Sequence, residues 1–505
     1  MNGSEAPKSP RNEGLEPPRG ALPTLRRLGP GLIVAGSIVG SGELIATTKV
    51  GAEAGFTLLW LIVLGCVVKV FTQVEFGRGA IGRGRTALQL LDALPGPRWR
   101  GSWAVWLWVV MTLLTLAQQG GIVGGVGQAL SMAAPLTEHG AALQQLQGAL
   151  VALQVEAATQ PGLGVALEAQ AEAARLRAEV EALGGAPDAV LWAGLLTAPT
   201  AVVLVFGRFT LIQLFATAMV VAFTLVTVLT VALLQAQPAW AIRSAELVDG
   251  LRFSLPPAGD AGGSSMGTAL AAFGIIGVGA AELVMYPYWC MEKGYATWAG
   301  AADGSDAWRA RARGWLRVMR WDAWLSALVY TFATVAFYLL GAAVLGRAGL
   351  NPEKGAMVRT LAQMYVPVFG AWARPMFLVG AFCVLYSTFF VASAGLARIA
   401  ADCLVVLGLS ERTEAARRRW TRVFCGLLPV VSFAVFAWVE APAKLVLAGG
   451  VAQALMLPVL GFAALWTRYR ATDVGLRPGR AWDVALWLSC AAFVVVGGWS
   501  LASRL

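Results

Sequence analysis

Apolar residues form long runs that recur along the whole chain and are separated by short polar segments. Most runs hold about 20 predominantly apolar residues, the length an α-helix needs to cross the hydrocarbon core of a bilayer. The pattern predicts an all-α polytopic membrane protein with eleven transmembrane helices. The predicted spans are residues 30–52, 56–77, 102–130, 188–206, 209–235, 266–290, 321–346, 374–404, 421–439, 443–466 and 481–503.

The basic residues predict the orientation of these spans. Alternate loops carry most of the lysines and arginines, with the densest clusters at residues 309–320 and 412–422. Cytoplasmic loops are enriched in these residues, so the N-terminus is predicted to be cytoplasmic and the protein to lie in the inner (plasma) membrane. Removing any one span would place basic clusters on both faces, which favours the count of eleven.

Three polar segments interrupt this pattern. Residues 1–27 are polar and rich in Pro and Gly, which predicts a disordered cytoplasmic tail before the membrane domain of residues 28–505. Residues 137–187 are predicted to form an extracytoplasmic helical hairpin insert, and we favour a surface decoration with no transport role. Residues 304–318 are predicted to form an amphipathic helix at the cytoplasmic interface.

Composition supports the membrane assignment and excludes several classes of function. The chain is 57% hydrophobic and 13% charged, whereas a soluble domain carries about 25% charged residues. The excess of 39 basic over 29 acidic residues fits cytoplasmic loops, so we expect no nucleic-acid partner. The six cysteines lack metal-ligand spacing, and no hydrolase, redox or ATP-binding motif is visible. We therefore predict neither an enzyme nor a resident cofactor.

Two short segments nearly repeat each other, and each places a glutamate inside an apolar run. Residues 39–45 read Val-Gly-Ser-Gly-Glu-Leu-Ile, and residues 278–284 read Val-Gly-Ala-Ala-Glu-Leu-Val. A charged residue at bilayer depth costs about 2.5–3.5 kcal/mol on insertion scales, so Glu43 and Glu282 are candidate functional residues. Matching interrupted helices in two halves of a chain are typical of secondary transporters with a binding site at the midplane.

The residues beside each glutamate predict that helices 1 and 6 are interrupted. Glycine has poor helix propensity, and the peptide groups around Gly40 and Gly279 would then lack helical partners. Two carboxylates and two freed carbonyl groups supply the oxygen ligands that a hard divalent cation prefers. The sequence therefore predicts a metal site formed by Glu43, Glu282, Gly40 and Gly279.

The charges of the two glutamates leave two interpretations open. Two carboxylates close together in a low dielectric cannot both stay ionised without a partner, so one holds a proton until a divalent cation neutralises the pair. Binding would then release protons, which offers a route to proton coupling. Alternatively, each glutamate pairs with a buried base, for which Lys49 and Lys69 are available.

The residues just described resemble the Nramp family of divalent metal transporters, over nearly the whole chain apart from the 137–187 insert. The stretch from residues 29–31 through residues 55–60 is similar to that family's first span, and residues 273–277 are similar to the start of its sixth span. The resemblance implies the leucine-transporter-like fold, with two inverted five-helix repeats plus an eleventh helix. It also implies import of Mn²⁺ and Fe²⁺ with protons.

The chain departs from the family at the metal-binding motifs. Gly40-Ser41-Gly42-Glu43 stands where the family has Asp-Pro-Gly-Asn, and Ala281-Glu282-Leu283 stands where it has Met-Pro-His. An acidic residue of the family's third span is Gln118 here, and Gly450 replaces its polar residue in span ten. Loss of the soft sulfur ligand favours hard cations, with Mg²⁺ or Mn²⁺ ahead of Fe²⁺, Zn²⁺ or Cd²⁺.

Several other residues are assigned to the surroundings of the site. Ser41, Gln118, Ala281 and Tyr286 are expected along the substrate path. Tyr286 is favoured as a packing residue, and Asp322 as half of an interfacial ion pair with Arg317 or Arg320. Glu75 is expected to form a surface pair with Arg78. Ser387 and Thr388 are expected to bond to their own helix.

These observations predict a secondary transporter that imports divalent metal cations, with the bilayer, the cation and protons as its partners. One alternative is a transporter of an organic amine or amino acid on the same fold, because Tyr286, Tyr288 and Trp289 would suit an ammonium group. A second alternative is a membrane scaffold or sensor that binds a partner through residues 137–187.

Overall fold

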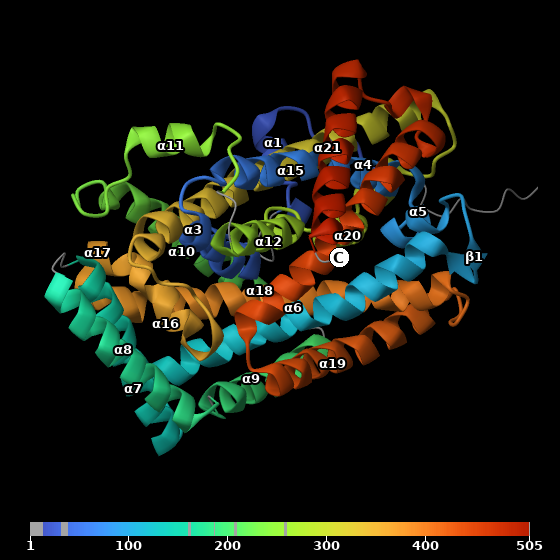
Figure 1. Cartoon of the computed structure of the whole chain (residues 1–505). Helices are drawn as coiled ribbons and strands as arrows, with labels where there is room; N and C mark the ends of the chain where they lie inside the picture. The colour runs from blue at the N-terminus through green and yellow to red at the C-terminus, as the bar shows by residue number, and fades with distance from the viewer. Residues whose placement is uncertain are drawn as a thin grey trace, which may run out of the picture.

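The computed structural model describes residues 14–31, 39–159, 163–185, 187–206, 210–256 and 260–503, and these are almost entirely helical (Figure 1). A short antiparallel pair, β1 (Arg98–Trp99) and β2 (Gly101–Ser102), is the only sheet among them. The long helices are α4 (Leu59–Arg83), α6 (Trp103–Ala133), α9 (Pro187–Phe206), α10 (Thr210–Leu234), α15 (Asp306–Leu340), α18 (Ala373–Val406), α19 (Glu414–Val439), α20 (Pro442–Trp466) and α21 (Arg480–Ala502).

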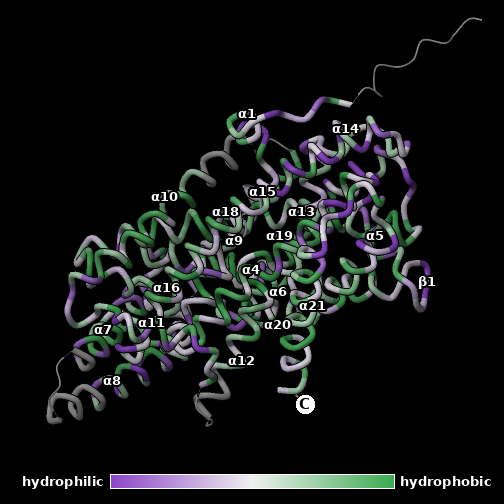
Figure 2. Tube along the Cα trace, turned by 90° about the horizontal axis from the view of Figure 1, so that it is seen from above, coloured by the Kyte–Doolittle hydropathy of each residue, from purple (hydrophilic) through white to green (hydrophobic). Residues whose placement is uncertain are grey.

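Nine helical stretches of the described chain are long and apolar enough to cross a membrane. They correspond to predicted spans two to four and six to eleven. The described apolar part of span five is shorter, at Ala218–Leu234, and span one falls partly outside the described residues. Hydrophobic residues follow the middle of the helices, whereas hydrophilic residues gather near α5, α14 and β1 at one end and near α7, α8 and α11 at the other (Figure 2).

Short helical elements connect the long ones. A left-handed glycine, Gly84, ends α4 before a capping box at Thr86 begins α5. The short elements are α1 (Ala21–Leu25), α5 (Ala87–Asp92), α11 (Ser244–Gly250), α14 (Tyr295–Ala299), η2 (Gly341–Gly346), η3 (Lys354–Ala356), α16 (Met357–Ala362), η4 (Gln363–Tyr365), α17 (Val366–Phe369), η5 (Gly370–Trp372), η6 (Thr467–Ala471) and η7 (Val474–Leu476).

The sixth span is interrupted, as the sequence predicts. It consists of α12 (Asp260–Ile275) and α13 (Ala280–Lys293), joined by residues 276–279. Gly277 has a φ of 58°, in the left-handed region that favours glycine. A Cβ atom at Gly277 would also lie 3.1 Å from the Cys66 Cα and from the Tyr330 ring. Glycine is therefore required here both for its backbone conformation and for the lack of space.

The first span is also irregular beside its glutamate. Residues 39–40 form a turn, the π-helix η1 runs from Gly42 to Thr47, and the α-helix α3 (Thr48–Ala54) follows. The Thr47 hydroxyl donates to the Gly42 carbonyl over 2.8 Å, which satisfies one backbone group in the widened turn. Such π-helical turns are rare and occur frequently at functional sites.

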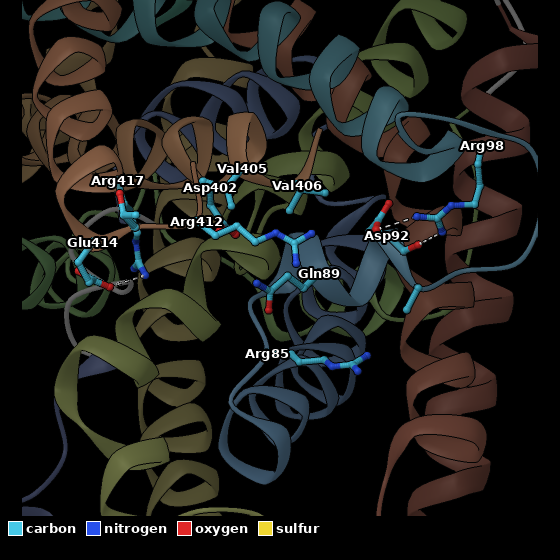
Figure 3. Close-up of a pocket in the computed structure, with 12 residues that line it drawn as sticks. Arg85, Gln89, Asp92, Arg98, Asp402, Val405, Val406, Arg412, Glu414 and Arg417 are labelled. Carbon is cyan, nitrogen blue, oxygen red and sulfur yellow. Dashed lines mark hydrogen bonds and ion pairs between the residues drawn. The ribbon is translucent and has the colours of Figure 1, made fainter. Parts of the chain in front are cut away.

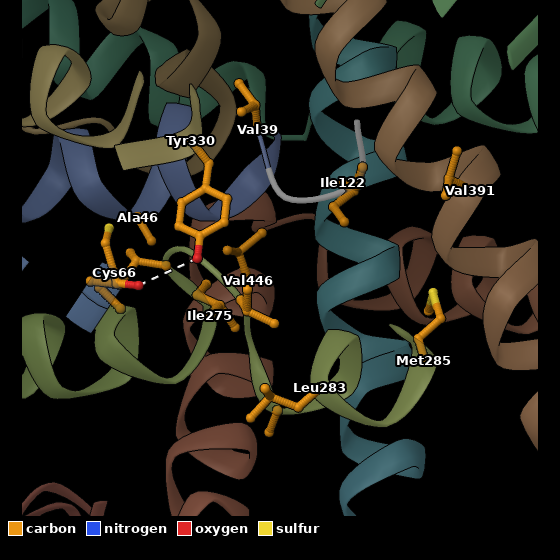
Figure 4. Close-up of a cluster of buried hydrophobic side chains, with 14 of the residues drawn as sticks. Val39, Ala46, Cys66, Ile122, Ile275, Leu283, Met285, Tyr330, Val391 and Val446 are labelled. Carbon is orange, nitrogen blue, oxygen red and sulfur yellow. Dashed lines mark hydrogen bonds between the residues drawn. The ribbon is translucent and has the colours of Figure 1, made fainter. Parts of the chain in front are cut away.

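Helix packing brings these two irregular segments together. α12 packs against α20 and η1, while α4 packs against α13 and α15. Gly42 lies so close to the end of α12 that a Cβ atom there would be 3.0 Å from the Ile275 carbonyl oxygen. Apolar side chains, including Ile275, Leu283 and Val446, surround this region (Figure 4). The Tyr330 hydroxyl donates to the Cys66 carbonyl over 3.4 Å within the same cluster.

Two polar segments differ from their predictions. The separate interfacial helix expected at 304–318 is instead the start of α15, which continues without a break into span seven. Residues 1–13 of the expected disordered tail lie outside the described residues. Residues 14–27, by contrast, include α1 and lie against α14 and α15, where the Trp315 indole donates to the Leu15 carbonyl over 2.9 Å.

The insert forms two helices, α7 (Glu138–Thr159) and α8 (Leu163–Leu183), which pack against each other. α7 also contacts α16, where Arg359 donates to the Gln144 side chain over 2.6 Å. A cavity of about 680 Å³ lies between the insert and residues that follow η2. At the opposite end, a cavity of about 480 Å³ is enclosed by α5, α18 and the start of α19 (Figure 3).

Candidate functional site

Glu43 lies in the first turn of η1 and is completely buried. Its carboxylate accepts three hydrogen bonds from two spans and from its own turn. Gly277 N–H and the Thr334 hydroxyl donate to Oε1 over 3.1 and 3.3 Å, and Gly40 N–H donates to Oε2 over 3.3 Å. Because each carboxylate oxygen accepts about two hydrogen bonds, Oε2 keeps capacity for a further ligand. Glu43 thus ties the first interruption to the second.

Glu282 lies in the first turn of α13 and is only 9% exposed. Backbone amides of Gly279 and Glu282 interact with its carboxylate, as suits an anion at the positive end of a helix. A Cβ atom at Gly279 would lie within 3 Å of both the Glu282 carboxylate and the Gln453 side-chain oxygen. Gly277 N–H, in the break just before α13, donates to the Glu43 carboxylate over 3.1 Å. The structure therefore brings the two glutamates into one buried site.

Lys69 of α4 is fully buried beside this pair. Its ammonium donates to the Phe273 carbonyl and, over 2.8 Å, to the Ile276 carbonyl, at the end of α12. It also lies over the Phe273 ring, 4.7 Å from the centroid. Lys69 forms no ion pair within 4 Å with either carboxylate among the described residues, so the alternative that it pairs directly with a site glutamate is wrong. Lys69 therefore donates to carbonyl oxygens that the break leaves without helical donors.

The alternative that Lys49 pairs with a site glutamate is wrong. Lys49 forms ion pairs of 2.8 Å with Glu53 and 2.7 Å with Glu353, and donates to the Asn351 side chain over 2.6 Å. These partners lie after the first span and after η2. Because Lys49 lies about one and a half helical turns after Glu43, its side chain projects from a different face of the first span. Of the two lysines considered, only Lys69 belongs to the site.

Four polar groups form a hydrogen-bonded chain across the site. Gln118 of α6 donates to the Ser41 hydroxyl over 3.3 Å and accepts from Gln453 of α20 over 2.6 Å. The Gln453 oxygen accepts from Ala281 N–H over 2.9 Å, at the start of α13. The chain thus links both interrupted spans to α6 and α20. The family resemblance places Gln453 and Gly449-Gly450 in this part of span ten and selects Gly450, whereas the structure places Gln453 at the site. A glutamine in an apolar helix is itself a signal.

Gly40 lies where the structure leaves no room for a side chain. A Cβ atom at Gly40 would overlap the Thr388 side chain of α18. The Thr388 and Ser387 hydroxyls each donate to the Val384 carbonyl over 2.9 Å, as predicted. No side chain fits at position 40 while Thr388 keeps this rotamer. The carboxylate of this segment is instead that of Glu43, three residues later.

Tyr286 and Asp322 form a separate cluster. Tyr286 donates to Asp322 Oδ2 over 3.1 Å, and the same carboxylate accepts Gly29 N–H over 2.9 Å and Gly31 N–H. Asp322 is 1% exposed and makes no ion pair in the described part of the chain, so the predicted pair with Arg317 or Arg320 is wrong. It instead caps the helical turn that begins at Pro30, whose missing N–H suits this position.

Replacing Asp322 with alanine is expected to lower the midpoint of thermal unfolding, because loss of this type of cap costs about 0.5–2 kcal/mol. Tyr286→Phe removes one hydrogen bond and should destabilise less, by about 0.5–1.5 kcal/mol. Scanning fluorimetry of the purified variants measures both. An unchanged midpoint for Asp322→Ala would contradict the capping role.

Glu75 and Arg78 also differ from their prediction as a surface pair. Their side chains are 0% and 4% exposed, and the two residues approach to 3.2 Å. The Trp482 indole donates to Glu75 over 2.7 Å, and Arg78 donates to the Leu476 carbonyl over 2.7 Å. α21 and η7 pack over this pair and bury it, and the sequence of α4 by itself does not indicate these neighbours.

The chemistry of the site follows from its donors. Within the described residues no three His, Cys, Asp or Glu side chains cluster as a closed metal cage. The site offers two carboxylates, a hydroxyl and amide oxygens instead. Such oxygen donors suit hard cations such as Mg²⁺ and Mn²⁺, which usually keep some of their water.

The prediction that Gly40 and Gly279 supply carbonyls without helical partners is wrong, because these carbonyls accept Leu44 N–H over 2.8 Å and Leu283 N–H over 2.9 Å. The carbonyls at the break that a side chain reaches are those of Phe273 and Ile276, and Lys69 donates to both.

Comparisons with known proteins support the fold. No protein-family model matches the sequence, and no curated protein matches it. A solved structure of an Eremococcus coleocola manganese transporter, bound to an aromatic bis-isothiourea substituted compound, is similar, with 17% identity and a TM-score of 0.60. A mutant of the same transporter gives 16% and 0.59. Both alignments cover 98% of this chain and 90% of the other.

A weaker likeness extends to Mhp1, a nucleobase-cation-symport-1 family transporter in a closed conformation, at 13% identity and a TM-score of 0.46 over 98% and 96% of the two chains. The likeness to the manganese transporter, at TM-scores of 0.59 and 0.60, confirms the all-helical, leucine-transporter-like fold of a multi-pass membrane protein. The count of eleven helices is not established, because nine candidate spans are identified in the described parts of the chain.

Proposed function

We propose that this protein is an Nramp-related secondary transporter that imports divalent cations across the cytoplasmic membrane, with Mg²⁺ or Mn²⁺ favoured. The observation that carries the proposal is the meeting of Glu43 and Glu282 in one buried site, each beside the interruption of a span. Discontinuous helices at midplane are the usual location of substrate and ion sites in such transporters. The shared fold with a manganese transporter supports the same function.

The charge of the site favours a divalent cation as substrate. Two buried carboxylates carry up to two negative charges, and Lys69 offsets one of them. A divalent ion that enters the site must compete with the Lys69 ammonium for the same oxygens. We propose that Lys69 holds the empty site closed and releases its carbonyl partners when the ion binds. Any proton coupling would then involve these three groups.

The aromatic residues give little support to the alternative organic substrate. Tyr286 donates to Asp322, and Tyr288 donates to Asp402 over 2.6 Å. The ring of Trp289 is covered by the Arg398 guanidinium at 4.7 Å. Each aromatic side chain that was proposed to hold an ammonium group is therefore engaged outside the carboxylate site.

Flux measurements in proteoliposomes test the proposed function. We expect saturable uptake of Mn²⁺ and Mg²⁺, slower uptake of Cd²⁺, and none in protein-free liposomes. An internal pH dye reports whether protons accompany the metal. Saturable uptake of an organic amine that divalent cations do not inhibit, together with no divalent flux, would contradict the proposal.

A further inference from the structure

An arginine-lined groove lies at the end of the molecule that carries α5, outside the carboxylate site. It consists of two adjoining cavities of about 480 and 370 Å³ that share Glu414 and Arg417. Seven arginines and four acidic residues line the two cavities together. This groove lies on the face that the basic residues predict to be cytoplasmic.

The acidic residues of the groove are already engaged. Asp92 pairs with Arg98 at 2.8 Å, and Glu292 pairs with Arg398 at 2.5 Å. Asp402 accepts the Thr86 and Tyr288 hydroxyls, both over 2.6 Å. Glu414 is shared between two arginines, Arg417 at 3.7 Å and Arg418 at 3.8 Å.

Three arginines of the groove remain available. Arg85, Arg412 and Arg422 make no ion pair or hydrogen bond with the described residues. Figure 3 shows Arg412 reaching into the larger cavity towards Gln89, with Arg85 beyond it. Arg422 lines the smaller cavity. Guanidinium groups present five donors in a planar fork that matches phosphate oxygens, so the free charge suits a phosphate group.

The smaller cavity also has an apolar wall. Leu204, Val205 and Phe206 at the end of α9 form this wall, and Phe206 is 77% exposed. Only 28% of the apolar stretch of α9, and 28% of that of α19, is buried inside the protein, the lowest values among the nine candidate spans. These two helices therefore leave most of their apolar surface uncovered by the rest of the protein, and residues of both line the smaller cavity.

We propose that this groove binds an anionic glycerophospholipid. Arg422 would hold the phosphodiester in the cavity that contains the α9 wall, and the first methylenes of an acyl chain would lie against that wall. Arg412 and Arg85 would add positive charge from the adjoining cavity. Basic pockets between transmembrane helices on the cytoplasmic side are recognised sites for such headgroups. A free phosphate would use the same arginines but would gain nothing from the apolar wall, which is why we favour the lipid.

Thermal unfolding of the delipidated, detergent-purified full chain tests this proposal. Phosphatidylglycerol or cardiolipin should raise the midpoint by several degrees in the wild type, and phosphatidylcholine should not. The effect should be lost in Arg412→Gln/Arg422→Gln. It should persist in Arg19→Gln/Arg100→Gln, a control that removes two exposed arginines of the same face outside the groove.

Native mass spectrometry counts bound lipid molecules directly. It can be applied to the single variant Arg412→Gln, so the proposal can be tested even if the double variant is unstable. We expect one or two retained anionic lipids in the wild type and fewer in the variant. Three outcomes would overturn the proposal: equal stabilisation by phosphatidylcholine, equal loss in the control variant, or stabilisation by inorganic phosphate alone, which would assign the groove to a soluble anion.

Discussion

Replacing Glu43 or Glu282 with glutamine is expected to raise the Kd for Mn²⁺ about 100-fold or more and to abolish uptake. Glutamine keeps the size and one oxygen of the side chain but removes a full negative charge from a buried site. A factor of 100 corresponds to about 2.7 kcal/mol. Charge interactions in a low dielectric exceed this value easily, so the estimate is conservative.

Isothermal titration of purified protein with Mn²⁺ and Mg²⁺ measures the loss of affinity, and proteoliposome flux measures the loss of transport. Glu75→Gln is the matched control, since Glu75 is an equally buried glutamate of the membrane domain that pairs with Arg78 outside the site. This variant should be less stable but should bind the metal with the Kd of the wild type. Normal flux in both site variants would rule out these glutamates as ligands.

Replacing Lys69 with glutamine is expected to tighten Mn²⁺ binding by at least tenfold while lowering thermal stability. The ammonium repels a divalent ion and competes with it for the carbonyls of Phe273 and Ile276. Its removal abolishes both effects, and the repulsion alone amounts to several kcal/mol at an effective dielectric of about 20. The freed carbonyls lose a charged donor, at a cost of about 1–3 kcal/mol each.

The same titration and an unfolding curve test the Lys69 variant. Lys49→Gln serves as control, because Lys49 binds Glu53 and Glu353 instead of the site, and its Kd should stay at the wild-type value. Transport by Lys69→Gln should be slower despite the tighter binding. In the wild type the ammonium can replace the ion on the carbonyl oxygens and so favour its release, and the variant lacks this replacement. Weaker binding in a folded Lys69→Gln protein would refute the competition between lysine and metal.

Some features of the site are local, and the sequence predicts them well. The interrupted spans follow from Gly40-Ser41-Gly42 and Gly277-Val278-Gly279, because glycine destabilises a helix whatever surrounds it. The glutamates stand out because charge is rare in apolar runs. The near repeat of the two segments predicts that they meet, and the structure joins them through the hydrogen bond from Gly277 N–H to Glu43 and the packing of α12 against η1.

Other features depend on partners that are distant in the sequence. Asp322 follows a run of arginines, which favours an ion pair, but the helix that reaches it begins 292 residues earlier at Pro30. Gln453 aligns with no expected ligand, yet α20 packs against α6 and places it beside Gln118. The contact of α7 with α16 through Arg359, and the cavity that α7 borders, likewise join residues that are distant in the sequence.

The sequence alone determined that this is a polytopic helical membrane protein with two glutamates beside helix breaks, because hydrophobic length, glycine propensity and buried charge act within one segment. Tertiary structure decided which groups neutralise those glutamates. Lys49 and Lys69 are both lysines in apolar spans, and the sequence does not distinguish them. Only the packing of α4 against α13 and of α12 against η1 places the Lys69 ammonium beside the carbonyls of Phe273 and Ile276. Hydrogen bonds and charges act over a few ångströms in space, and the chain sets that distance only after it has folded.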